Sequence, residues 1–166
     1  MPASDQQVSN HRYLIIPRTL IFIRRGESFL LIKGASTKRL WANKYNGLGG
    51  HIEQGEDILS AARRELSEET GLSTHLNLCG MVMVNTGGNI GVGIFVFTGE
   101  YRGGEAISSN EGTLEWVPVS ELGDKPVVED VRIFLERIIN MHPGDPIFFG
   151  YSFYDSDDRL VVQLSP

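Results

Sequence analysis

Three glutamates in the segment GHIEQGEDILSAARRELSEETGL, residues 50–72, have a spacing that suits a divalent cation. Glu65, Glu68 and Glu69 stand at positions i, i+3 and i+4, so on an α-helix they share one face. Like charges at this spacing weaken an isolated helix by roughly 0.2–0.5 kcal/mol per pair, and a bound cation would relieve that cost. Carboxylate oxygens are hard ligands that select Mg²⁺, with Mn²⁺ as the alternative. The segment therefore predicts a divalent-cation site.

The same segment resembles the Nudix box at every position that defines the box. The matching residues are a glycine, a glutamate six positions later, an Arg-Glu pair, a Glu-Glu pair and a closing glycine: Gly50, Glu56, Arg64, Glu65, Glu68, Glu69 and Gly71. The alternative is an amphipathic surface helix with a solvated charged face, which would leave the flanking glycines and Glu56 without an explanation. The resemblance implies a metal-dependent hydrolase with an α+β fold, in which a mixed β-sheet is sandwiched between α-helices.

The resemblance also implies a set of metal ligands and a catalytic base. The ligands would be Glu65, Glu68, Glu69 and the backbone carbonyl of Gly49. Mg²⁺ held there can neutralise phosphate oxygens and activate a water molecule for attack on phosphorus. Glu68 is the first choice for the base that takes the proton. Glu111, in the loop SSNEGTLEW, is the runner-up and a further ligand from outside the box, while a plain surface charge is its alternative role.

The other box residues have supporting roles. Arg64 is grouped with the catalytic residues because it would orient the carboxylates through charge-assisted hydrogen bonds. Glu56 would brace the loop, and Gly50 and Gly71 are structural members of the box. Ordinary salt bridging is the alternative reading for Arg64 and Glu56.

Substrate recognition is expected from residues outside the box. Asn46, Glu129 and Asp130 resemble the purine-reading residues of MutT-type hydrolases of oxidised purine nucleoside triphosphates. A carboxyl pair could read a purine edge if one member held a proton, since it would donate one hydrogen bond while its neighbour accepted another. The chain departs from that group, because Val127 and Val128 stand where Trp-Pro is usual and the first acid is Glu rather than Asp. The acids could also serve the helix dipole alone.

The sequence also allows other functions. The expected reaction converts a purine nucleoside triphosphate to the monophosphate and pyrophosphate. The alternatives are a Nudix hydrolase of ADP-ribose or a nucleotide sugar, and a non-catalytic module that senses a nucleotide. No proline occurs between Ser73 and Val117, which disfavours many ADP-ribose hydrolases, and the complete set of box glutamates disfavours a sensor.

Composition limits the partners. The chain has 166 residues, 41% of them hydrophobic, and a net charge of −6. A nucleic acid polymer is disfavoured, because phosphate backbones are bound through clustered Lys and Arg. The start, MPASDQQVSN, has no apolar signal region, and no apolar run is long enough to cross a membrane. We therefore expect a cytoplasmic protein whose partner is a small-molecule nucleotide, with a homodimer left open.

The order of elements must place these residues together. Residues 1–17 are expected to form a loose N-terminal arm, and 18–166 a single Nudix hydrolase domain. The box helix is predicted from 58 to about 70, with Asp57 as its N-cap and Gly71 at its end. A second helix is predicted over 127–141. Strands are predicted at 19–23, 29–32, 76–85, 90–98 and 115–119, followed by a hairpin that turns at 155–158.

Overall fold

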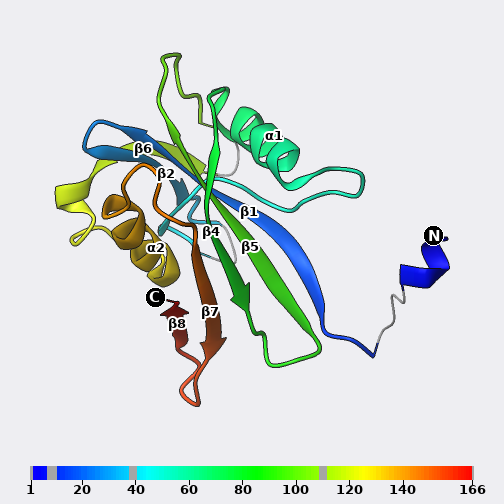
Figure 1. Ribbon diagram of the computed structural model, residues 1–166. Helices are drawn as coiled ribbons and strands as arrows, with labels where there is room; N and C mark the ends of the chain where they lie inside the picture. The colour runs from blue at the N-terminus through cyan, green and yellow to red at the C-terminus, as the bar shows by residue number, and fades with distance from the viewer. Residues whose placement is uncertain (1, 7–10, 38–40, 109–111, 166) are drawn as a thin grey trace.

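A curled mixed β-sheet with one α-helix on each face forms the molecule, which confirms the predicted α+β class with a mixed sheet between helices (Figure 1). The computed structural model describes residues 2–6, 11–37, 41–108 and 112–165. Its elements in chain order are η1 (Ala3–Gln6), β1 (Leu14–Arg25), β2 (Ser28–Gly34), β3 (Tyr45–Asn46), α1 (Ile58–Thr70), β4 (Asn77–Val84), β5 (Ile90–Glu100), β6 (Gly112–Pro118), η2 (Val119–Glu121), α2 (Glu129–Ile139), β7 (Phe148–Tyr154) and β8 (Leu160–Leu164).

Strand β1 lies near the middle of the sheet and has one parallel and one antiparallel neighbour. The strand order is β3-β2-β1-β5-β4-β7-β8, with β6 also paired to β2. β1 runs parallel to β5 and antiparallel to β2, and β7 runs parallel to β4. The hairpin of β7 and β8 forms the far edge of the sheet.

Alternate residues of β1 point to two separate cores. Ile21 and Ile23 belong to the core under α1, whereas Phe22 belongs to the core under α2. This alternation follows from the period of two residues in a strand. A central strand with both faces covered therefore carries the unbroken apolar run LIFI. The two helices therefore cover opposite faces of the sheet.

Helix α1 begins and ends at the residues that the sequence predicts. The side chain of Asp57 accepts hydrogen bonds from the backbone N–H groups of Leu59 and Ser60. Gly71 has φ 71°, in the left-handed region, and its N–H donates to the carbonyl of Ser67. Both are the usual devices that satisfy unpaired backbone groups at helix ends.

Strand β1 extends into the range expected to be a loose arm. It begins at Leu14, and residues 14–17 pair in parallel with residues 90–93 of β5. Parallel pairing between segments so distant in the chain leaves no local sequence signal. Within the described ranges, no helix is long and apolar enough to cross a membrane.

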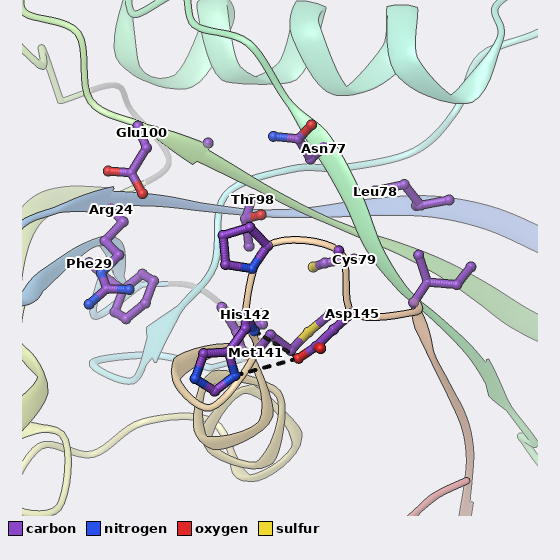
Figure 2. A pocket seen from close by; sticks show the side chains of 15 residues that line it. Arg24, Phe29, Asn77, Leu78, Cys79, Thr98, Glu100, Met141, His142 and Asp145 are labelled. Carbon is purple, nitrogen blue, oxygen red and sulfur yellow. Dashed lines mark hydrogen bonds and ion pairs between the residues drawn. The ribbon is translucent and has the colours of Figure 1, made fainter. Parts of the chain in front are cut away.

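A cavity of about 530 Å³ lies at the C-terminal end of α2, away from the predicted site (Figure 2). Burial raises the pKa of the Cys79 thiol in its lining to about 12, so this sulfur is not a nucleophile. His142, also in the lining, pairs with Asp145 at 3.7 Å between Nδ1 and Oδ2. None of the described box residues from Gly50 to Gly71 contributes to this lining.

Candidate active site

Backbone pairing with β1 fixes the loop that carries the box glycines. Ile21 and Leu48 exchange both backbone hydrogen bonds, at 2.7 and 3.1 Å. The N–H of Thr19 donates to the carbonyl of Gly50 at 2.8 Å. Arg18 forms an antiparallel bridge with His51. The loop therefore acts as a short added strand along β1, and its glycines are held facing α1.

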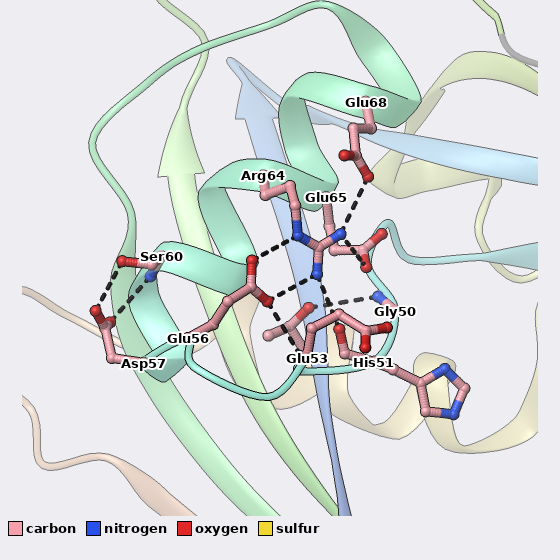
Figure 3. A network of polar contacts seen from close by, with 10 residues as sticks. Gly50, His51, Glu53, Glu56, Asp57, Ser60, Arg64, Glu65 and Glu68 are labelled. Atoms are coloured by element: carbon pink, nitrogen blue, oxygen red, sulfur yellow. Dashed lines mark hydrogen bonds and ion pairs between the residues drawn. The ribbon is translucent and has the colours of Figure 1, made fainter.

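Arg64 is the centre of the polar network in Figure 3. Its Nε and Nη2 donate to the two carboxylate oxygens of Glu56 at 2.7 and 3.0 Å. Its Nη1 donates to Glu65 at 2.9 Å and to Glu68 at 3.0 Å, and Nη2 also donates to the carbonyl of His51 at 3.1 Å. The carboxylates, with Glu56 first and Glu65 second, raise the pKa of Arg64 above its ordinary value. One guanidinium thus ties the glutamates of α1 to the loop.

Glu56 connects this network to the turn before α1. Beside its two bonds from Arg64, it accepts a hydrogen bond from the N–H of Glu53 at 3.1 Å. The hydrogen bonds from Arg64 and then from Glu53 hold the pKa of Glu56 below its ordinary value of 4.5. Glu56 therefore carries a negative charge at neutral pH, and it links the loop to the helix.

Gly49 and Gly50 bring backbone close to two of the predicted ligands. The N–H of Gly49 donates to Glu69 at 2.7 Å, and Glu69 is only 6% exposed. Gly49 has φ 121°, which favours glycine. A Cβ at Gly50 would lie 2.6 Å from Oε1 of Glu65, so a side chain there would displace the carboxylate. These contacts explain why the loop needs two glycines.

The predicted ligands are engaged with the protein itself in this structure. Glu65 and Glu68 accept from Arg64, and Glu69 accepts from Gly49. Across the ranges that the structure describes, no three or more His, Cys, Asp or Glu side chains converge as a metal site would require. The donor set nevertheless fits a hard cation, because it consists of carboxylates on one helix face. The Glu68 side chain is 61% exposed, so its carboxylate is accessible to such an ion.

A cavity of about 350 Å³ joins the box to the predicted base-binding residues. Its lining includes Gly49, Gly50 and Glu65 together with Asn46 and Asp130. The structure thus brings together residues that stand more than eighty positions apart in the chain.

Backbone pairing between β3 and the segment before α2 brings Asn46 close to Asp130. The N–H of Tyr45 donates to the carbonyl of Pro126, and the N–H of Val128 donates to the carbonyl of Tyr45, both at 2.9 Å. Asn46, next in the chain, accepts a hydrogen bond from the N–H of Gly47 at 2.8 Å, which orients its amide. Asn46 and the start of α2 are consequently held beside the same cavity.

The two acids at the start of α2 have different surroundings. Asp130 accepts from the N–H of Val131 at 2.9 Å, and burial raises the pKa of its carboxyl. Glu129 is exposed, pairs with Lys44 at 3.5 Å and lines an adjoining cavity of about 610 Å³ that also contains Asp130. Asp130 is therefore the acid that faces both cavities. Glu111 lies outside the described residues.

Two residues that the sequence does not mark as site residues, Arg18 and Trp41, line both cavities. Arg18 precedes the apolar run of β1, and alternation along the strand places it on the α2 face with Leu20. Trp41 is 43% exposed and has φ 57°, which is rare for a large side chain. Strand alternation was the available signal for Arg18. For Trp41 the signal was its type alone, since it is one of several aromatic residues that could stack on a base or pack in the core.

A family profile, two relatives and a solved structure are similar to this chain. The family profile described as NUDIX domain matches residues 15–138. The oxidized purine nucleoside triphosphate hydrolase of Danio rerio is 31% identical over 145 residues, covering 86% of this chain and 89% of the relative. The protein of the same description from Mus musculus is 28% identical over 149 residues, covering 88% and 92%. The crystal structure of a MutT protein from Bacillus halodurans superposes with a TM-score of 0.77 at 24% identity, over 92% of this chain and 99% of the other.

Proposed function

The chain belongs to the Nudix family, and on that premise we propose that it hydrolyses purine nucleoside triphosphates, oxidised purines included, to monophosphate and pyrophosphate in a metal-dependent reaction. The family match and the relatives support a Nudix pyrophosphohydrolase that acts on small nucleotides. The observation that carries the choice of substrate is the cavity shared by Asn46, Asp130, Gly49 and Glu65. A nucleotide with its base at the first pair and its phosphates at the second would occupy it.

The residues that would hold the cation are Glu65, Glu68, Glu69 and the carbonyl of Gly49. Mg²⁺ is the expected ion and Mn²⁺ the alternative. The cation, when bound, neutralises phosphate oxygens and lowers the pKa of a coordinated water. Arg64 keeps Glu65 and Glu68 on the same side of α1, so the carboxylates are oriented before the substrate arrives.

Glu68 is the proposed base. Its exposed carboxylate accepts one described hydrogen bond, from Arg64, and so retains oxygen lone pairs that can take a proton. As water attacks phosphorus, the new phosphorus–oxygen bond forms, the bond to the leaving group breaks and the water proton passes to Glu68. Glu111 remains the second candidate for this role.

Asn46 and Asp130 are proposed to read the purine. The raised pKa of Asp130 favours its protonated form, which can donate a hydrogen bond to a base acceptor. The amide of Asn46, oriented by the N–H of Gly47, offers both donor and acceptor atoms at the same cavity. Glu129 is exposed and lines the adjoining cavity, so it would contact the base only from that side.

A substrate panel tests this function. Normal and oxidised purine nucleoside triphosphates, ADP-ribose, dinucleoside polyphosphates and nucleotide sugars are assayed with Mg²⁺ and ranked by kcat/KM. We expect a purine nucleoside triphosphate to rank first and to yield a monophosphate and pyrophosphate. A higher kcat/KM for ADP-ribose or a nucleotide sugar would overturn the substrate assignment, and binding with no product would favour a sensor.

A further inference from the structure

Arg18 is a cation inside the cavity that no step described above uses. It lies on β1 between its pairing partners, Ile94 of β5 and His51 of the loop. It lines the cavity that contains the box glycines and the adjoining cavity that contains Glu129. Its Nε atom is buried and has no hydrogen-bond partner among the described residues. A buried guanidinium nitrogen without a partner is costly, so this position favours a ligand that supplies an acceptor.

Arg64, the other arginine near the glutamates, has no donor left for a substrate. A guanidinium has five N–H donors. Five hydrogen bonds link Arg64 to Glu56, Glu65, Glu68 and the carbonyl of His51. Arg64 can orient carboxylates but cannot bind a phosphate without breaking this network.

The lining of the smaller cavity is otherwise acidic or neutral. Its carboxylates are Glu53 and Glu65, beside the acid Asp130, and among the described residues that line it Arg18 is the one lysine or arginine. A nucleotide phosphate entering this cavity would meet repulsion from the carboxylates, and Arg18 supplies the opposite charge from the protein. The planar guanidinium can offer Nε and one Nη to two oxygens of the same phosphate.

We propose that Arg18 binds the substrate phosphate nearest the sugar. This phosphate would lie between the base, held by Asn46 and Asp130, and the glycines Gly49 and Gly50. This inference rests on the proposed function, since it assumes a nucleotide in the cavity. It assigns Arg18 to substrate binding and leaves proton transfer to the box.

Binding without turnover tests the proposal. Affinities for dGMP and for deoxyguanosine are measured in EDTA for the wild type, Arg18→Gln, Arg18→Lys and the control Arg102→Gln. Arg102 is exposed and lines neither cavity as described, so its variant removes the same charge elsewhere. We expect Arg18→Gln to bind dGMP about 10- to 100-fold more weakly, with unchanged affinity for deoxyguanosine. The affinity of Arg18→Lys for dGMP should be intermediate. The control should bind dGMP as tightly as the wild type, and no variant should have a lower melting temperature.

Equal losses for dGMP and deoxyguanosine would overturn the proposal, because they would indicate contact with the base or structural damage. Unchanged dGMP affinity would overturn it, and so would a wild type that binds dGMP no more tightly than deoxyguanosine. The result is separable from the proposed function. A selective loss for dGMP, in a protein that hydrolyses nothing in the panel, would retain Arg18 and reject the hydrolase. If the wild type hydrolyses a nucleotide and the Arg18→Gln variant binds dGMP normally, the hydrolase is retained and the role of Arg18 is rejected.

Discussion

Arg64 determines how Glu56 responds to pH. Its hydrogen bonds, together with the N–H of Glu53, hold the pKa of Glu56 below the ordinary 4.5. A carboxyl with a lower pKa in the folded state stabilises the fold above pH 4.5. That contribution is lost as the pH falls from 4.5 through the folded pKa.

Arg64→Met should therefore destabilise the protein in a pH-dependent way. In EDTA at pH 7 we expect its melting temperature to fall by roughly 4 °C or more, because several carboxylates lose their partner. The difference from wild type should shrink below pH 4.5, where Glu56 becomes protonated in the unfolded chain. Denaturation curves from pH 7 to 3 measure it, with the exposed neighbour Arg63→Met as the control. A difference that stays constant over this range would mean that Arg64 contributes through packing alone.

Glu68→Gln tests the proposed base. The substitution keeps the side-chain size and removes both charge and basicity, so kcat with saturating Mg²⁺ should fall on the order of 10²-fold or more. Folding should survive, because the Glu68 side chain is 61% exposed and its one described side-chain bond is to Arg64. Glu136→Gln, at an exposed position of α2, is the matched control. Turnover near that of wild type would remove Glu68 from the role and favour Glu111.

At the scale of elements, the start of α2 serves two purposes. Its N-cap, Val128, makes no side-chain capping bond. The acids of the first turn, Glu129 and Asp130, instead interact favourably with the positive end of the helix dipole. Asp130 also lines the cavity, where burial raises its pKa. An acid whose pKa is higher folded than unfolded destabilises the fold at neutral pH and does so less as the pH falls through the folded pKa.

Asp130→Asn separates these purposes. An amide fixes one donor and one acceptor, so discrimination among purines should fall by about 1–3 kcal/mol in kcat/KM for the preferred base. Because the ionised carboxyl is disfavoured by burial, the melting temperature at pH 7 should not decrease. Hydrolysis of a diphosphate without a purine should change little. A uniform fall over all substrates would indicate damage to the helix start, and no change would mean that Asp130 serves only the helix.

The elements differ in how well the sequence predicts them. Both bounds of α1 were predictable, because Asp57 and Gly71 satisfy the helix ends through local contacts. The start of β1 was not, because residues 14–17 are ordered by pairing with β5, far along the chain. The contacts of Arg64 were only partly predictable. The box resemblance implies that Arg64 bonds the carboxylates, and its i, i+4 spacing suits the bond to Glu68. The bond to the His51 carbonyl depends on how the loop lies along β1.

At the scale of the whole molecule, the sheet separates the two tasks of the site. α1 covers one face and carries the proposed metal ligands, and α2 covers the other and carries Asp130 (Figure 1). The loop with Gly49 and Gly50 lines the same cavity as Asp130. The fold class followed from the box resemblance, but the shared cavity follows from the strand order. No local pattern shows that Tyr45 pairs with the segment before α2, or that Arg18 meets the loop.

Hydrolysis in H₂¹⁸O is the most direct test of the central claim, which is metal-dependent attack of water on a purine nucleoside triphosphate. Wild-type protein, Mg²⁺ and the preferred triphosphate are incubated in labelled water, and the products are weighed by mass spectrometry with a parallel reaction in EDTA. The account predicts one ¹⁸O on a phosphate product and no turnover in EDTA. Tight nucleotide binding with no labelled product, for every nucleotide tested with Mg²⁺ or Mn²⁺, would contradict it.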